Sequence, residues 1–188
     1  MLIQIRTLEN KDLRLGIWRL PNSVSHGGKR AVERAAAHEL LSEMLGYPVE
    51  IQHDTNGAPL VEGFHISISH TRGYLVILLS KCYRVGVDIE YRSDRISKIA
   101  SRFLRQDEPF ELVGDMLLCW CAKEALYKLR SSAHLTYEQM RVRLSSSLID
   151  DLVQGDTVSF HQAHTSEYVL VWMWEKDNSR GDSSNRGA

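Results

Sequence analysis

Two carboxylates stand two residues apart in a short apolar stretch of the chain, Val85-Gly86-Val87-Asp88-Ile89-Glu90. The β-branched residues indicate a strand, in which successive side chains point to opposite faces, so Asp88 and Glu90 are expected on one face. Carboxylates that close repel each other unless a cation lies between them. A hard divalent ion with oxygen ligands, Mg²⁺ above all, removes that repulsion. The same pattern also fits an exposed strand end that carries two solvated acids.

A second pair of chemical groups lies on a stretch of good helix formers, residues 116–129. Glu124 and Lys128 are four residues apart, and they share a helix face with Trp120. This is the spacing of an ordinary helical ion pair. It is also a spacing that can bring a third carboxylate and an ammonium group to the acidic strand.

Two basic residues, Lys29 and Arg30, open a helix that the apolar spacing predicts over residues 29–45. Basic side chains at a helix start oppose the helix dipole. They therefore either face solvent or serve another purpose, such as binding an anion.

A further basic group is expected on residues 95–106, which the apolar spacing predicts to be an amphipathic helix. Lys98, Arg102 and Arg105 follow one another at helical spacing and predict one basic face. That face is either solvated or a docking surface for an acidic partner.

Most of the remaining elements are predicted strands. Residues 64–69, 74–80 and 85–90 predict a three-stranded meander, whose continuous apolar middle strand is central and buried. Further strands are expected at 2–6, 13–20, 48–53, 141–144, 157–161 and 168–174. The order strand, helix, strands occurs twice. We therefore expect an α+β fold of two similar halves, residues 1–84 and 85–176, with a disordered tail over 177–188.

Composition narrows the function classes. The 188 residues are 43% hydrophobic and 25% charged, with a net charge of -1, which favours a globular protein and argues against nucleic acid or anionic membrane as partner. No apolar run approaches the ~20 residues that span a bilayer, and no signal-peptide core is evident, so a cytoplasmic protein is expected. The common glycine-rich nucleotide loops are absent.

Three motifs stand in a fixed order: Ile68-Ser69-His70-Thr71, then Gly86-Val87-Asp88-Ile89-Glu90, then Trp120-x-x-Lys123-Glu124-Ala125 with Lys128. In order and spacing, the chain resembles the 4′-phosphopantetheinyl transferases. It is most similar to the larger type that activates nonribosomal peptide and polyketide synthetases. The resemblance runs from about residue 29 to about residue 130.

The resemblance implies an enzyme, a holo-acyl-carrier-protein synthase. Such enzymes transfer the phosphopantetheine arm of coenzyme A to a serine of an acyl or peptidyl carrier protein, release adenosine 3′,5′-bisphosphate and require Mg²⁺. The implied fold is a pseudo-twofold pair of similar halves in one chain, with the active site and coenzyme A between them. Since one chain then holds the whole site, we expect a monomer.

The resemblance also implies roles for individual residues. Asp88 and Glu90 match the metal-binding acids of the family, and Glu124 matches the third acid, which is also the base for the carrier serine. Lys128 matches a lysine on the phosphate that is attacked.

Contacts with coenzyme A are implied for Ser69 and for His70, the latter on the 3′-phosphate. Lys123, Lys128, Lys29 and Arg30 are expected to contact coenzyme A as well. The basic residues Lys98, Arg102 and Arg105 gain a purpose, because carrier proteins present acidic helices.

The chain departs from the family pattern at two positions. Ala58 stands where the family usually has a lysine, and His38 stands where it usually has an arginine. Because the resemblance implies that this lysine and this arginine bind coenzyme A in the family, weaker coenzyme A binding is expected for this chain. Two alternatives remain open: a Mg²⁺-dependent phosphodiesterase acting on a nucleotide, and a non-catalytic homologue that only binds coenzyme A or a carrier.

Overall fold

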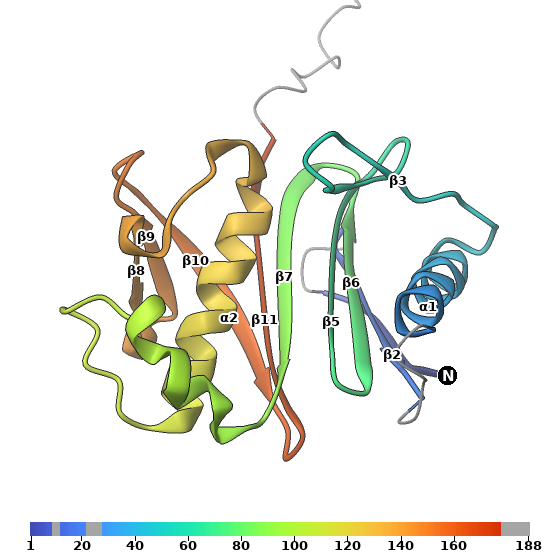
Figure 1. Ribbon diagram of the computed structural model, residues 1–188. Coiled ribbons are helices and arrows are strands. Elements are labelled where there is room, and N and C mark those ends of the chain that lie inside the picture. Colours follow the sequence, from blue (N-terminus) through green and yellow to red (C-terminus); the bar gives the residue numbers. More distant parts are fainter. Residues whose placement is uncertain (9–11, 22–27, 178–188) are drawn as a thin grey trace, which may run out of the picture.

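A computed structural model describes residues 1–8, 12–21 and 28–177 of the chain. It has two antiparallel sheets packed against each other, with one long helix on the outer face of each (Figure 1). The α+β class expected from the sequence is confirmed. No helix within these ranges is both long enough and apolar enough to cross a membrane.

The first sheet contains four strands, and helix α1 (Lys29–Leu45) covers its outer face. In spatial order the strands are β1 (Leu2–Thr7), β2 (Arg14–Arg19), β6 (Tyr74–Ser80) and β5 (His65–Thr71). All seven residues of β6 are buried, which confirms the expected central strand. A separate ribbon of β3 (Gln52–His53) and β4 (Pro59–Leu60) follows α1.

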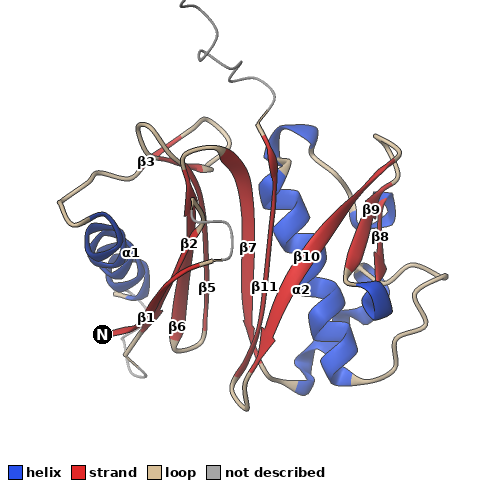
Figure 2. Ribbon diagram, turned by 180° about the vertical axis from the view of Figure 1, so that it is seen from behind, coloured by secondary structure: helices blue, strands red, loops and turns tan. Residues whose placement is uncertain are grey.

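The second sheet contains five strands, and helix α2 (Val113–Leu129) packs on its outer face, as the view from behind also shows (Figure 2). Its spatial order is β7 (Tyr83–Tyr91), β11 (Tyr168–Lys176), β10 (Asp156–His164), β9 (Leu148–Asp151) and β8 (Met140–Arg143). The short 3₁₀ helices are η1 (Asp94–Arg102), η2 (Ser131–Ala133), η3 (Tyr137–Gln139) and η4 (Leu144–Ser146).

The expected three-stranded meander is only partly correct. Strands β5 and β6 pair as a hairpin, but β7 pairs with β11 and begins the second sheet. Strands β5 and β7 still lie side by side. They are joined by hydrogen bonds between side chains of β5 and the backbone of β7, in place of backbone-to-backbone hydrogen bonds. The hydroxyl oxygens of Ser67 and Thr71 accept the backbone N–H groups of Val87 and Tyr91, each at 3.0 Å. The two sheets are therefore joined along the edge that carries the acidic residues.

Between the sheets, one face of β7 enters an apolar core. Val85, Val87 and Ile89 are buried against β2 and β6, so the opposite face of β7, which carries Asp88, turns toward α2. The alternation expected from the sequence thus holds, and it places the acidic face at the boundary between the two sheet-and-helix units.

Gly86 allows α2 to approach β7 closely. A Cβ atom at this position would lie 2.1 Å from the carbonyl oxygen of Ala125 and 2.9 Å from Cβ of Leu129. Both neighbours belong to α2, so the glycine sets the distance between the strand that carries Asp88 and the helix that carries Glu124.

We expect Gly86→Ala to destabilise the protein by about 3 kcal/mol, because backbone atoms of α2 must move to admit the methyl group. The matched control is Gly114→Ala, where the new Cβ would meet only a guanidinium nitrogen of Arg92 at 3.9 Å. Since Gly114 lies in α2, this change should be neutral or stabilising by about 0.5 kcal/mol. Urea unfolding of the three proteins measures both effects, and equal midpoints for Gly86→Ala and wild type would contradict the close approach.

An ion network holds the C-terminal end of α2 to the second sheet. The buried guanidinium of Arg130 donates to Asp151 Oδ2 at 2.7 Å, to Asp156 Oδ1 at 2.7 Å and to Glu175 Oε2 at 2.8 Å. The network therefore connects the end of the helix with β9, β10 and β11.

This network predicts acid-dependent stability. Burial alone would raise the pKa of Asp151, but hydrogen bonds from the Gln154 backbone and from Arg130 hold that pKa below its ordinary value. A carboxyl with a lowered folded-state pKa contributes stability that is present above its unfolded pKa of about 4 and is lost as the pH falls through its folded pKa. We expect Asp151→Asn to lower the free energy of unfolding by about 2 kcal/mol at pH 7. Urea unfolding at pH 7 and at pH 3 should show this cost shrinking, and an equal cost at both values would contradict the assignment.

Candidate functional site

The acidic residues of β7 meet hydroxyl groups of β5 at the junction of the two sheets. Asp88 Oδ1 accepts a hydrogen bond from Ser69 Oγ at 2.7 Å. Two residues further along both strands, Glu90 Oε2 accepts a hydrogen bond from Thr71 Oγ1 at 3.1 Å. Ser69 and Thr71 are therefore placed by the same alternation that aligns the two acids.

Helix α2 brings the remaining charged groups to the same junction. The ammonium of Lys128 lies 2.6 Å from Asp88 Oδ1 and 3.1 Å from the carbonyl oxygen of Val87. One helical turn earlier, Glu124 Oε1 accepts a hydrogen bond from the Tyr137 hydroxyl at 2.5 Å. Trp120, another turn earlier, donates its Nε1–H to Glu90 Oε1 at 3.1 Å. The helix thus places the three side chains Trp120, Glu124 and Lys128 along one face, as their spacing predicts.

The electrostatics show that these carboxylates influence one another. Burial raises the pKa of Glu90, and the charge of Asp88 raises it further, against the hydrogen bonds from Thr71 and Trp120. Burial likewise raises the pKa of Glu124; the Tyr137 hydrogen bond opposes this shift and the charge of Asp88 adds to it. The charge of Asp88 thus contributes to the raised pKa of both Glu90 and Glu124. A cation bound among these carboxylates would lower both pKa values.

The donor chemistry fits a divalent cation, although its ligands are not gathered around one point. Within the described ranges, no three or more His, Cys, Asp or Glu side chains converge as metal ligands. However, Asp88 Oδ2 is buried and makes no hydrogen bond with any described residue, which leaves one oxygen for a ligand. Mg²⁺ prefers such carboxylate oxygens, and it would relieve the repulsion described above. The carboxylates of Asp88, Glu90 and Glu124 thus have the donor chemistry that such an ion prefers, and the Tyr137 hydrogen bond occupies only one of the two oxygens of Glu124.

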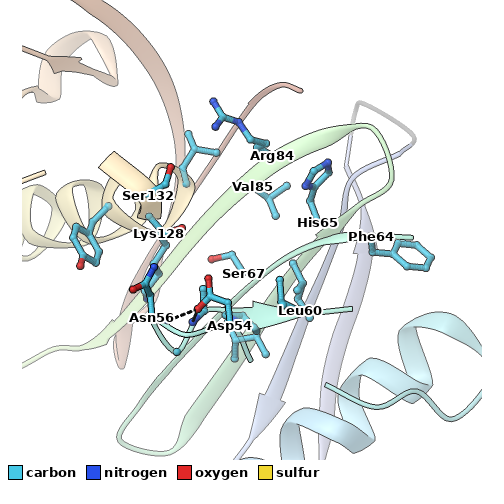
Figure 3. A pocket seen from close by; sticks show the side chains of 18 of the residues that line it. Asp54, Asn56, Leu60, Phe64, His65, Ser67, Arg84, Val85, Lys128 and Ser132 are labelled. Atoms are coloured by element: carbon cyan, nitrogen blue, oxygen red, sulfur yellow. Dashed lines mark hydrogen bonds between the residues drawn. The ribbon is translucent and has the colours of Figure 1, made fainter. Parts of the chain in front are cut away.

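A cleft of ≈ 500 Å³ lies beside this junction, between the two sheet-and-helix units. Figure 3 shows Ser67 of β5, Val85 of β7 and Lys128 of α2 around it, with Asp54 and Asn56 on the loop that closes one side. The cleft therefore has an ammonium group in its wall.

The loop between β3 and β4 forms the tight turn expected from Asn56-Gly57. Asp54 Oδ1 accepts the backbone N–H groups of Asn56 and Ala58, both at 2.8 Å, and Gly57 adopts a positive φ of 83°. Ala58 lines the cleft with a methyl group, so this wall contributes no cation at the position where the resemblance expects a lysine.

Two further cavities lie near the end of β5. One, of ≈ 920 Å³, is bounded by α1 and β5 and is lined by residues that include Arg30, His38 and His70. The other, of ≈ 530 Å³, is lined by residues that include Lys29, His70 and Trp120. The structure thus brings Arg30, Lys29 and His70 to neighbouring cavities, with Lys29 and Arg30 on different ones.

Lys123 occupies a position that the sequence-based prediction did not expect. Its side chain is fully buried, and its ammonium donates to Glu108 Oε2 at 2.6 Å and to the carbonyl oxygens of Phe103 and Tyr137 at 2.7 and 3.1 Å. All three partners belong to the core of the second unit. Because the ammonium has no access to a ligand, Lys123 is corrected from a coenzyme A contact to a structural residue.

The expected basic helix face is also corrected. Residues 94–102 form a 3₁₀ helix, with about three residues per turn, so Lys98 and Arg102 do not lie one above the other. Arg105 lies beyond the helix, and its guanidinium binds Asp107 at 2.8 Å and the backbone of Glu138. Lys98 and Arg102 are exposed, whereas Arg105 is held against the protein.

Several site residues were missed by the sequence-based reasoning. Thr71 continues the period-two pattern of Ser67 and Ser69, a signal that could have been used. Tyr137 comes from η3 and Glu33 from the buried side of α1, and no spacing in the sequence connects either with the acids of β7.

Comparison with known families identifies a match over the second unit. The family model described as the 4′-phosphopantetheinyl transferase superfamily matches residues 84–180. This range includes Asp88, Glu90, Glu124 and Lys128, whereas Ser69 and His70 precede it. A comparison with curated proteins finds no match to the chain.

Proposed function

Because this chain belongs to the 4′-phosphopantetheinyl transferase superfamily, we propose that it transfers the 4′-phosphopantetheine arm of coenzyme A to a serine of an acyl or peptidyl carrier protein, as a holo-acyl-carrier-protein synthase. Adenosine 3′,5′-bisphosphate is the second product. Within the superfamily, we assign the chain to the larger type that activates nonribosomal peptide and polyketide synthetases.

The observation that carries this proposal is the junction of three carboxylates and one ammonium beside a cleft. Strand β7 carries Asp88 and Glu90, and helix α2 carries Glu124 and Lys128. The two elements approach closely at Gly86, and Lys128 both pairs with Asp88 and lines the cleft. Breaking a pyrophosphate develops negative charge on phosphate oxygens, which a fixed cation stabilises in a site sheltered from water. Lys128, which lines the cleft and pairs with Asp88, is proposed to supply such a cation.

Glu124 is proposed as the general base. The carrier serine oxygen attacks the β-phosphorus of coenzyme A, the bond from that phosphorus to the bridging oxygen breaks, and the serine proton passes to Glu124. A base is most effective when its pKa lies near the working pH. The raised pKa of Glu124 moves it in that direction, and the Tyr137 hydroxyl holds the carboxylate in place.

Mg²⁺ is proposed to bind at Asp88, Glu90 and Glu124, where it would neutralise charge on the pyrophosphate and orient its oxygens. Lys128 pairs with Asp88 Oδ1 at 2.6 Å, so Asp88 Oδ2 is the oxygen that would remain for the ion. Ser69 keeps the Asp88 carboxylate oriented through its 2.7 Å hydrogen bond.

Coenzyme A is proposed to lie along the junction of the two units. Its nucleotide end occupies the ≈ 920 Å³ cavity beside Arg30 and His70, and its phosphates pass Lys128 in the wall of the ≈ 500 Å³ cleft. The contact expected for Ser69 stays a proposal, since Ser69 lines neither of these two cavities and donates its hydroxyl to Asp88. Lys29, on the neighbouring cavity, is proposed to approach the same phosphates. The affinity for coenzyme A is expected to be lower with Ala58 and His38 than with a lysine and an arginine at these positions.

The carrier protein is proposed to dock over η1, where the side chains of Lys98 and Arg102 are exposed. Their positive charges would attract an acidic helix of the carrier. We further propose that the two sheet-and-helix units, 1–84 and 85–176, are the two similar halves of a pseudo-twofold monomer that acts in the cytoplasm. Each unit has an antiparallel sheet and one 17-residue helix, which supports this division.

Intact-mass analysis of an apo carrier protein tests the function directly. The carrier is incubated with this protein, coenzyme A and Mg²⁺, and we expect it to gain the mass of one phosphopantetheine arm. Chelation of Mg²⁺ should abolish the gain. Release of adenosine 3′,5′-bisphosphate without any carrier would instead identify a phosphodiesterase, and no gain with several carrier classes would contradict the proposed transfer.

A further inference from the structure

The ≈ 530 Å³ cavity reaches the acidic residues from a different end than the cleft that Lys128 lines. Its wall contains Glu90 and Trp120, which are joined by a hydrogen bond of 3.1 Å. Lys128 lies two helical turns beyond Trp120 on α2. The cavity also has an apolar part, formed by Ile96, Ile99 and Leu117. It therefore gives a second access to the site, beside Glu90.

Three exposed basic residues surround this cavity, and we call them the basic mouth. They are Arg72 from the turn between β5 and β6, Arg95 from η1 and Lys29 from the start of α1. Glu90 is the only acid of the described lining, and both of its oxygens already accept hydrogen bonds. In the lining of the ≈ 920 Å³ cavity, by contrast, two arginines face two glutamates. The excess of positive charge is therefore at the basic mouth.

The two arginines of the basic mouth come from the two different units. The turn that carries Arg72 and the segment that follows β7 lie at the same end of the molecule (Figure 1). The guanidinium carbon of Arg72 lies 5.4 Å from the ring centre of Tyr91, the last residue of β7. This cation–π contact holds the side chain at the mouth and leaves its charge in place. Within the described ranges, neither Arg72 nor Arg95 forms an ion pair.

On the premise of the proposed function, we propose that the basic mouth is a docking surface for an acidic helix of the carrier protein, whose carboxylates bind Arg72 and Arg95. The pantetheine arm itself is uncharged, so it would gain little from these cations. The carrier supplies negative charge, and it must also bring its serine to the acids next to Glu90. Because Arg72 belongs to the first unit, the carrier contacts both units and not η1 alone.

A different role for the basic mouth leads to a different result. If its arginines bind phosphates of coenzyme A, reversing their charge weakens coenzyme A binding even when no carrier is present. If they bind the carrier, the same change weakens carrier binding and leaves coenzyme A binding nearly unchanged. Two separate affinity measurements thus distinguish the two roles.

Fluorescence anisotropy measures the affinity for the carrier without any transfer. The probes are a labelled acyl carrier protein and a labelled peptidyl carrier domain, in each of which the acceptor serine is changed to alanine. They are titrated with wild type, Arg72→Glu, Arg95→Glu and the matched control Arg6→Glu. The control reverses an exposed charge on β1, at the opposite edge of the first sheet from β5.

The two variants of the basic mouth should bind the carrier about tenfold more weakly than wild type at low salt. The difference should shrink at about 0.5 M NaCl, because the charges are exposed. Arg6→Glu should resemble wild type. Coenzyme A binding, measured by calorimetry, should change by less than about threefold in all variants.

Two results would overturn the docking surface: an unchanged carrier affinity in both variants of the basic mouth, or a loss of coenzyme A affinity as large as the loss of carrier affinity. Absence of carrier binding by wild type would overturn it too.

A parallel transfer assay with an apo carrier keeps the two proposals distinguishable. Carrier binding that depends on Arg72 and Arg95, but no transfer from coenzyme A, rejects the enzyme function and leaves the docking surface intact. Transfer by Arg72→Glu and Arg95→Glu with the carrier KM of wild type rejects the docking surface alone.

Discussion

Glu124→Gln should lower the rate of phosphopantetheine transfer about 10²–10⁴-fold, the range expected when a positioned general base is lost. The amide has nearly the same shape, and its oxygen can still accept the hydrogen bond of Tyr137. What it loses is the ability to take the serine proton and to act as a charged metal ligand. The change therefore acts on the chemistry and leaves the fold in place.

The time course of carrier mass gain, with coenzyme A and Mg²⁺ in excess, measures this loss. Glu111→Gln is the matched control, since it neutralises an exposed carboxylate that lies just before α2. Coenzyme A binding by Glu124→Gln, followed by calorimetry, should stay near that of wild type. Transfer at an undiminished rate would remove Glu124 from the role of base, whatever the fate of the other site residues.

Lys123→Met should destabilise the protein by about 3–5 kcal/mol, because it leaves the carboxylate of Glu108 buried without its cation. Both side chains of this pair are fully buried, and the ammonium also holds two backbone carbonyls that lie before and after α2. Glu108 Oε1 in turn accepts the backbone N–H of Val142 on β8 at 2.6 Å. The pair therefore connects three segments around the second core.

Denaturant unfolding of Lys123→Met and of the double variant Lys123→Met/Glu108→Gln measures the size and the cause of this effect. The double variant should be less destabilised than the single one, since no unpaired charge is left in the core. Where the single variant is folded, its affinity for coenzyme A should equal that of wild type. A selective loss of affinity without loss of stability would return Lys123 to the binding site.

Local patterns in the sequence determined much of the candidate functional site. Alternation along a strand placed Asp88 and Glu90 on one face, and helical spacing placed Glu124 and Lys128 on another. Both periodicities follow from backbone geometry alone, so they survive whatever the strand and the helix later pack against. The all-apolar strand 74–80 was likewise identifiable as central, because only a strand buried on both faces has no polar alternation.

Only the tertiary structure decided what these faces meet. Lys123 adjoins Glu124 in the sequence, yet it points into the core, where Glu108 was the partner that no local pattern named. Glu33 and His70 are 37 positions apart in the sequence, yet their side chains lie 3.3 Å from each other in the lining of one cavity. Strand β7 left the expected meander for β11, because side-chain hydroxyls of β5 could satisfy its free edge. Periodicity fixes the direction of a side chain relative to its own element, whereas its partner depends on long-range packing that the whole chain must satisfy at once.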